Sequence, residues 1–328
     1  MKLATPCLVL AALMAPVGGQ VCAQGALVLD DKIQLGEVRG RIDHMAIDLG
    51  RRRLFVAELE NDSVAVVDLE ARKVAHVISN ARTPQGLGYL PANDTLYVAN
   101  GGDGALRIFA GNDYRYLETI PLGDDADNVR VDNAAKQVLV SYGDGAIAVI
   151  DATTRKKISD IALASHPESF QLDRRMNRLF INEPKRQVIT VVERDTDQVT
   201  AEWKIRNNSN FPMALNEAAG HVLVVFRNPT QIAVFAASNG STETSLETCG
   251  DADDMFTDAK RSRVYVSCGE GFVDVFDTRD GKYQRVGHLL TVPGARTSLF
   301  VPELDRLFLA VRATAQEPAA IWVFRPMP

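Results

Sequence analysis

The sequence predicts an all-β fold, a seven-bladed β-propeller of four-stranded antiparallel blades. Three observations lead to it. A pattern of short apolar strands recurs seven times, successive copies are separated by roughly 42 residues, which lies in the range of propeller repeats, and one strand is left over near the amino end. No segment shows the 3.6-residue apolar periodicity of an amphipathic helix. The chain is therefore expected to bury its core between sheets.

One repeat is clearest in residues 53–78, RLFVAELENDSVAVVDLEARKVAHVI. Three apolar runs are separated by turns at 61–62 and 69–72, and a fourth run, 44–48, precedes them. Four antiparallel strands joined by such turns make one blade. The strand that begins this stretch recurs at 54–56, 96–98, 138–140, 179–181, 222–224, 264–266 and 307–309.

The ends of the chain predict how the ring closes. The last repeat has strands near 299–301, 307–309 and 321–324, and it lacks a fourth. Residues 32–35 supply a spare strand before the first full blade. Pairing it with the last blade leaves no open sheet edge, so residues 24–328 are predicted to form a single propeller domain.

The first 23 residues have the pattern of a cleaved signal peptide. Lys2 gives the positive start, 8–17 the apolar run and 21–23 the cleavage site, so the mature chain is expected to begin at Gln24. The apolar run is too short to span a bilayer. A lipoprotein would instead be acylated at Cys22, but Val21 is larger than the residue expected before such a cysteine. The protein is therefore predicted to be periplasmic or secreted.

Export bears on the two remaining cysteines, Cys249 and Cys268, which are predicted to form a disulfide in an oxidising compartment. Neither belongs to a CxxC or CxxCH motif; the alternative is a pair of buried thiols. The net charge of −6, without a long run of Lys or Arg, makes nucleic acid an unlikely class of partner.

The repeats resemble the YVTN-type propeller repeat, and the whole chain is similar to exported YncE-like seven-bladed propellers. The resemblance rests on the segments LYVANGGDG (96–104), GDDADN (123–128) and CGDADD (249–254), and it covers nearly all of the mature chain. It implies the fold. It does not imply one function, because such propellers include binding scaffolds and serve unrelated chemistries.

The candidate site lies where each chain segment begins an innermost strand, because these positions surround one end of the channel. They vary from blade to blade and are mostly polar, unlike a repeated structural turn. The predicted ligand-binding residues are Asp43, His44, Gln85, Asp127, Asn128, Glu168, Asp253, Asp254 and Arg296. Phe211, at the same position of the fifth repeat, is expected to pack between blades.

The loops on this face are predicted to be acidic, while the opposite face is closer to charge balance and richer in Arg and Lys, which include residues 51–53, 174–175 and 260–261. An acidic mouth favours a cation or a positively charged partner. Alternatively, the acids cap the innermost strands through hydrogen bonds to the backbone. His44 would be either a general base or metal ligand, or a hydrogen-bonded residue of the channel. Arg39, Arg41, Arg82 and Arg296 would hold an anion or neutralise the acids.

These residues predict an exported protein that binds a small ligand, a cation or a protein partner at the acidic mouth. GxSxG, HExxH, P-loop and haem-attachment motifs are absent from the sequence. The alternative is a lactonase-like hydrolase in which Glu168, Asn128, Asp253 or Asp254, and Asp43 hold a divalent cation such as Ca²⁺. A third reading, from the fold alone, is an accessory protein of a periplasmic dehydrogenase.

Overall fold

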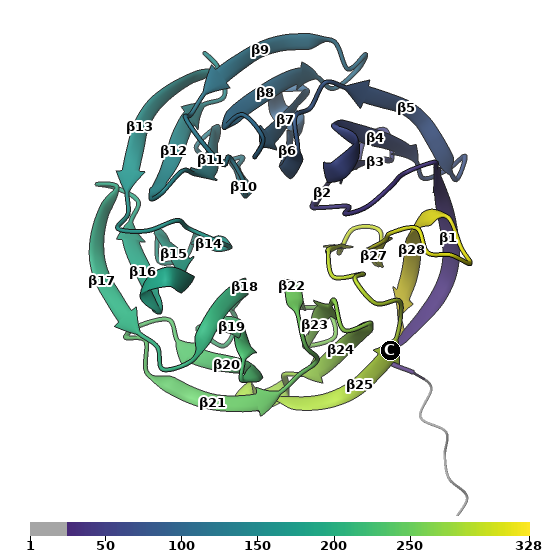
Figure 1. Ribbon diagram of the computed structural model, residues 1–328. Coiled ribbons are helices and arrows are strands. Elements are labelled where there is room, and N and C mark those ends of the chain that lie inside the picture. Colours follow the sequence, from purple (N-terminus) through teal and green to yellow (C-terminus); the bar gives the residue numbers. More distant parts are fainter. Residues whose placement is uncertain (1–24) are drawn as a thin grey trace, which may run out of the picture.

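The structure is a computed structural model that describes residues 25–328, and these residues form a ring of seven four-stranded antiparallel sheets around a central channel (Figure 1). The predicted fold class is confirmed. The predicted signal peptide, with Cys7 and Cys22, lies outside the described residues.

Each blade runs from an innermost strand at the channel to an outermost strand at the rim, and in six blades the four strands follow one another in the sequence. Blades 1 to 3 are β2 (Met45–Asp48), β3 (Arg53–Glu58), β4 (Ser63–Asp68), β5 (Lys73–Ser79); β6 (Pro84–Leu90), β7 (Thr95–Asn100), β8 (Ala105–Ala110), β9 (Tyr116–Pro121); and β10 (Val129–Asp132), β11 (Gln137–Tyr142), β12 (Ala146–Asp151), β13 (Lys156–Ala162). Blades 4 to 6 are β14 (Phe170–Asp173), β15 (Arg178–Glu183), β16 (Val188–Glu193), β17 (Gln198–Lys204); β18 (Asn208–Asn216), β19 (His221–Asn228), β20 (Thr230–Ala236), β21 (Thr242–Glu247); and β22 (Ala252–Asp258), β23 (Arg263–Cys268), β24 (Phe272–Asp277), β25 (Gln284–Leu290).

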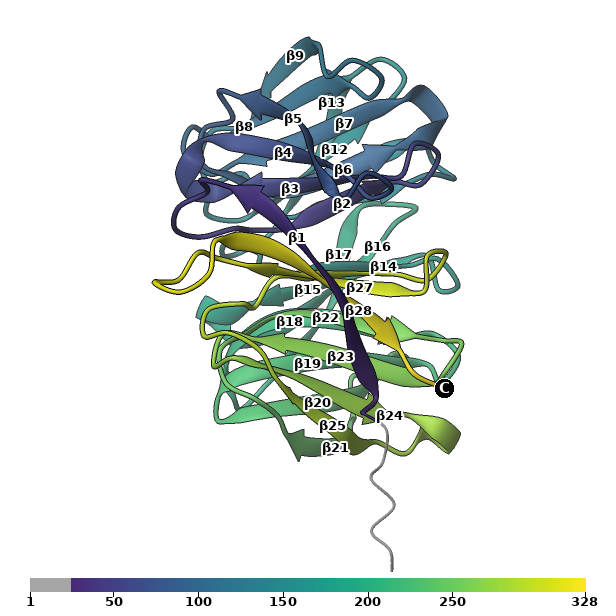
Figure 2. The same ribbon diagram turned by 90° about the vertical axis from the view of Figure 1, so that its right-hand side faces the viewer.

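Blade 7 is completed by the amino end of the described chain, as the sequence predicts. Its strands β26 (Ser298–Val301), β27 (Arg306–Val311) and β28 (Ala319–Pro326) are followed at the rim by β1 (Leu27–Gly36). β1 pairs antiparallel with β28 along its whole length, from Leu27 opposite Pro326 to Gly36 opposite Ala319. Figure 2 shows the two strands side by side. This pairing removes the open edge that the last blade would otherwise present.

The hydrophobic core lies between blades. Seven clusters of buried side chains correspond to the seven contacts between neighbouring blades, including the contact of blade 7 with blade 1. The second and third strands are buried on both faces, as β3 and β4 show, whereas the outermost strand β5 exposes most of its residues. This pattern explains why the second and third strands read as continuous apolar runs in the sequence.

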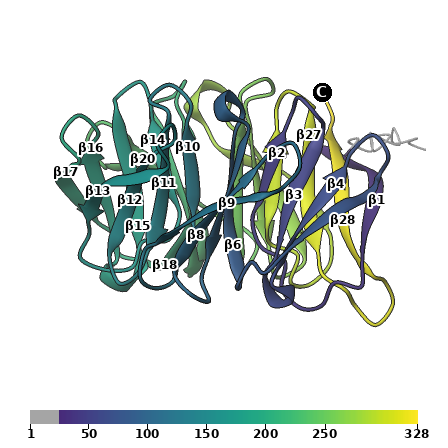
Figure 3. The same ribbon diagram turned by 90° about the horizontal axis from the view of Figure 1, so that it is seen from above.

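The turns gather on the two faces of the ring, which Figure 3 shows edge-on. The only helical segments in the described chain are the short 3-10 turns η1 (Leu59–Asn61), η2 (Pro91–Asn93), η3 (Pro184–Arg186) and η4 (Arg279–Gly281). Asp62, Asp94 and Gln187 follow three of these turns with φ near 50°, the left-handed conformation that reverses the chain between strands. From residue 25 to 328, no helix is long and apolar enough to cross a membrane.

Candidate functional site at one end of the central channel

The polar residues predicted from the repeat converge at one end of the channel, hereafter called the mouth. Asp43 and His44 precede β2, Asp127 and Asn128 precede β10, and Glu168 precedes β14. The mouth contains a cavity of about 30 Å³, and below it the channel widens into a cavity of about 500 Å³ between the innermost strands. The smaller cavity is lined by Arg41, His44, Asp127, Asn128, Glu168, Ser169, Phe211 and Asp253.

On one side of the mouth, arginines neutralise the carboxylates. Arg227 Nη2 lies 2.8 Å from Asp253, and Arg296 Nε lies 3.0 Å from the same carboxylate. Arg296 also binds Asp251 at 2.8 Å, and Arg41 Nη2 lies 2.8 Å from Asp43. Arg41 and Arg296 therefore neutralise the acidic ring, the second of the two roles considered for them. This part of the mouth is called the paired side below.

His44 lies between two carboxylates. Its Nδ1 lies 3.3 Å from Asp254 and its Nε2 lies 3.8 Å from Asp43. Burial alone would lower the pKa of His44, but the charges of Asp254 and Asp43 outweigh it and raise the pKa to about 10. Asp254 also accepts a hydrogen bond from the Ser298 backbone N–H at 2.8 Å. Both ring nitrogens of His44 face carboxylates, which favours the hydrogen-bonded residue of the channel over the general base or metal ligand.

The other side of the mouth lacks such partners. Within the described chain, no arginine or lysine forms an ion pair with Asp127 or Glu168. Burial raises the pKa of Asp127 to about 6, although the charge of His44 opposes the shift. Burial, together with repulsion from Asp127, raises the pKa of Glu168 to about 7. These two carboxylates and the nearby His166 are called the unpaired side.

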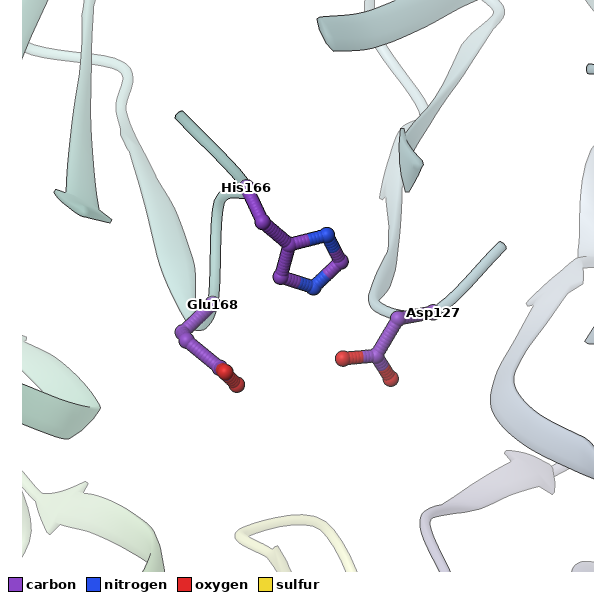
Figure 4. Close-up of side chains that lie close together, drawn as sticks. All are labelled: Asp127, His166 and Glu168. Carbon is purple, nitrogen blue, oxygen red and sulfur yellow. The ribbon is translucent and has the colours of Figure 1, made fainter. Parts of the chain in front are cut away.

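His166 was missed as a site residue from sequence, where its place before Pro167 in a loop gives no signal. Its Nε2 lies 3.8 Å from Asp125, and one ligand atom from each of Asp127, His166 and Glu168 lies within 4.8 Å of the others (Figure 4). The three side chains point toward a common space. They are the residues at the mouth that could hold a metal ion. Of the residues that the sequence suggests as cation ligands, Glu168 and Asn128 lie on the unpaired side.

The other predicted and missed residues surround these two sides. Gln85 does not line the mouth cavity. Its Nε2 donates a hydrogen bond to Asp125 at 2.9 Å. Phe211 lines the mouth instead of packing between blades, because the Arg227 guanidinium lies over its ring, 3.9 Å from the centroid. Arg227 was missed because it lies near the end of β19, a second strand of 8 residues, whereas the other second strands have 6 and end before this position.

The predicted disulfide is confirmed. Cys249 and Cys268 are joined, with their Cα atoms 5.8 Å apart. The bridge encloses the segment that carries Asp251 and Asp253, the two carboxylates that the arginines hold. Asp274 fixes the same segment from the next strand, because its carboxylate accepts the Cys249 N–H at 2.9 Å. The part of the paired side that contains Asp251 and Asp253 therefore lies on a loop braced by the disulfide.

Comparison with known proteins supports the fold and names no family. No family model matches the chain, and no curated protein matches its sequence. A chain in the crystal structure of the mitotic checkpoint complex is similar with a TM-score of 0.76 and 11% identity, over 98% of this chain and 99% of that one. A chain in Kuenenia stuttgartiensis hydrazine synthase is similar with a TM-score of 0.72 and 15% identity, over 93% of this chain and all (100%) of that one. At these identities the likeness is one of fold, and this fold is typical of binding and interaction scaffolds.

Proposed function

We propose that this protein is an exported, YncE-like binding propeller that takes a positively charged ligand, or the charged group of a partner, at the mouth. The observation that carries the proposal is the pair Asp127 and Glu168, two partly buried carboxylates that line the mouth with no arginine or lysine partner in residues 25–328. A cation entering this site would neutralise both of them. The cavity between them, about 30 Å³, admits an ion or a single ammonium group.

Export and family membership are parts of the same proposal. They are supported by the amino-terminal pattern of residues 1–23 and by the disulfide, a bond typical of oxidising compartments. Cell fractionation followed by amino-terminal sequencing tests them. The periplasmic or secreted protein is expected to start at Gln24, and a cytoplasmic protein that retains Met1 would contradict export.

Calorimetric titration of the purified protein with spermidine, a small polycation, tests the binding function. We expect spermidine to bind in the micromolar to millimolar range, more weakly as salt rises, and the dianion glutarate not to bind. Glu168→Gln is expected to weaken spermidine binding about tenfold, since it removes one charge from the site. Asp144→Asn is the matched control, because Asp144 is an exposed carboxylate on the turn between β11 and β12, in the same blade as Asp127, and does not line the mouth cavity. Equal binding of spermidine and glutarate would contradict the proposal.

A second candidate, a lactonase-like hydrolase, is favoured by one observation. Asp127, His166 and Glu168 offer three metal ligands on a side of the cavity that remains open, as in catalytic metal sites. The test is hydrolysis of δ-valerolactone by protein loaded with a divalent metal. Activity that disappears in Glu168→Gln but persists in Asp144→Asn would support the hydrolase, and activity unchanged in both variants would exclude this site.

A further inference from the structure

The orientation of His166 provides the first step toward a specific ligand. His166 lies in the segment between β13 and β14, and its Nδ1 is 2.5 Å from the carbonyl oxygen of Gly143. A carbonyl only accepts hydrogen bonds, so Nδ1 carries the hydrogen in the neutral ring and Nε2 carries a lone pair. Metal-binding histidines are commonly fixed in this way by a backbone carbonyl. Nε2 is the nitrogen that faces the unpaired side.

The second step is the distance between donors. The three ligand atoms of Asp127, His166 and Glu168 lie within 4.8 Å of one another, and Figure 4 shows both carboxylates and the imidazole directed into the same space. Ligands of a tetrahedral zinc ion, with bonds near 2.0–2.1 Å, are separated by about 3.3 Å. The donors therefore need to approach by at most about 1.5 Å, a change within reach of side-chain rotation of an aspartate and a glutamate.

Asn128 is an independent sign of a missing ligand. Its side chain is buried, at 4% exposure, and it lines the same cavity as Asp127 and Glu168. Its Nδ2 donates to Asp127 at 3.2 Å, whereas its Oδ1 accepts no hydrogen bond from any described residue. A buried acceptor without a partner is costly, and a bound cation or its water would satisfy it.

The third step concerns which cation these donors select. Carboxylate and amide oxygens alone would favour Ca²⁺, the ion suggested by the sequence. The imidazole of His166 changes this, because nitrogen ligands favour first-row transition metals, and Zn²⁺ accepts a mixed set of imidazole and carboxylate donors. On the paired side Arg227 and Arg296 already neutralise Asp253, so the negative charge available to a cation lies with Asp127 and Glu168.

We infer that Asp127, His166 and Glu168 bind one divalent transition-metal ion of the Zn²⁺ type, with Asn128 orienting Asp127 and at least one coordination position open at the mouth. The inference rests on the proposed function, since it assigns a specific cation to the same carboxylates. It extends that function by naming His166 as a ligand and by excluding Ca²⁺ as the preferred ion.

Equilibrium dialysis and calorimetry of the full mature protein, first stripped with a chelator, test the inference with Zn²⁺ and Ca²⁺ as separate probes. We expect one equivalent of Zn²⁺ to bind at least tenfold more tightly than Ca²⁺. Co²⁺ in place of Zn²⁺ is expected to give visible absorption bands from an imidazole-containing site. Tighter binding of Ca²⁺, or no stoichiometric Zn²⁺, would overturn the inference.

Substitutions at the ligands locate the ion. His166→Gln, Asp127→Asn and Glu168→Gln are each expected to weaken Zn²⁺ binding about 100-fold, and His166→Gln to remove the Co²⁺ bands. The matched controls are His76→Gln on the exposed outer strand β5 and Asp144→Asn, both expected to bind Zn²⁺ as the wild type does. Circular dichroism and the melting temperature of the metal-free variants show whether each one is folded. Zn²⁺ binding that survives His166→Gln in folded protein would overturn the assignment.

The same experiments separate this inference from the proposed function. If spermidine binds in a manner sensitive to Glu168→Gln while Zn²⁺ does not bind, the metal inference fails and the binding function stands. If neither probe binds, both fail. Stoichiometric Zn²⁺ that depends on His166 supports both, because the ion is itself a positively charged ligand of the mouth.

Discussion

Acidic side chains have opposite roles at the two ends of the channel. At the end away from the mouth, Asp48, Asp132, Asp173 and Asp258 close four of the innermost strands, and each accepts backbone N–H groups of the turn that follows. At the mouth, Asp127 and Glu168 occupy corresponding places at the start of innermost strands and have no cationic side chain paired with them in the part of the chain described.

At the end away from the mouth, arginines bridge aspartates of neighbouring blades. Arg51 joins Asp48 to Asp94 of the next blade, and Arg261 joins Asp258 to Asp305. Hydrogen bonds from Arg261 lower the pKa of Asp305 to about 2, and those from Arg51 lower the pKa of Asp94. The pKa values of Asp127 and Glu168 move the other way. The aspartates at the ends of the innermost strands therefore stabilise the ring, and the carboxylates without an arginine partner among the described residues, Asp127 and Glu168, mark the candidate site.

The largest effect is expected at the end away from the mouth. Arg261→Met should lower the free energy of unfolding by about 3 kcal/mol, because it leaves two carboxylates, Asp258 and Asp305, without their shared cation. Asp258 is 2% exposed and the Arg261 side chain 10%, so water replaces little of the lost interaction. Urea denaturation measures the change. A loss below about 0.5 kcal/mol would contradict a structural role for this ion pair.

An effect of opposite sign is expected at the mouth. In metal-free protein near neutral pH, Glu168→Gln should raise the free energy of unfolding by about 1 kcal/mol, because it removes a charge that burial and Asp127 destabilise. The same denaturation experiment in the presence of a chelator measures it. Zn²⁺ should reverse the order and make the wild type the more stable protein. Destabilisation of the metal-free variant would contradict the assignment of an unpaired carboxylate.

The pH dependence of stability sharpens the same comparison. The raised pKa values mean that Asp127 and Glu168 keep their protons in the native state up to about pH 6 and 7, whereas in the unfolded chain they lose them near their ordinary pKa values of 3.8 and 4.5. The free energy of unfolding of metal-free protein should therefore fall as pH rises from about 5 to about 8. His44, whose pKa is about 10, adds to the fall above its ordinary value of 6.5. Asp305 acts in the other direction and only in acid, below about pH 4.

Denaturation curves at about pH 5 and about pH 8 measure this slope. The double variant Asp127→Asn/Glu168→Gln should lose most of it between pH 5 and 7, and Asp144→Asn should keep it. A wild-type protein that is more stable at about pH 8 than at about pH 5 would contradict the raised pKa values at the mouth.

The smallest effect is expected on the exposed surface. Glu70→Gln breaks the ion pair of Glu70 with Arg52, whose atoms lie 3.4 Å apart and whose side chains are 74% and 55% exposed. Solvent screens such a pair, so the melting temperature should not change measurably. A clear loss of stability would mean that surface charges, and not only the enclosed ones, contribute to the ring.

The sequence predicts the fold well because each blade repeats its own signal. The apolar runs, the turn residues and the spare strand at 32–35 are local features, and every copy reinforces the others. The site is only partly predictable. Asp127 and Glu168 occupy repeat positions, whereas His166 lies two residues before one and Arg227 lies on a second strand. The roles of the site residues depend on contacts between side chains of different blades. One such contact joins Arg41 to Asp253, and it forms only when the ring is closed.

The pairing of β1 with β28 also sets an order of events during synthesis. Residues 27–36 are synthesised well before their hydrogen-bonding partners, residues 319–326, which lie far downstream in the chain. Until then a ten-residue strand has both edges exposed, and the seventh contact between blades cannot form. The nascent chain can build the middle blades as it lengthens, but the ring cannot close until residues 319–326 have been made.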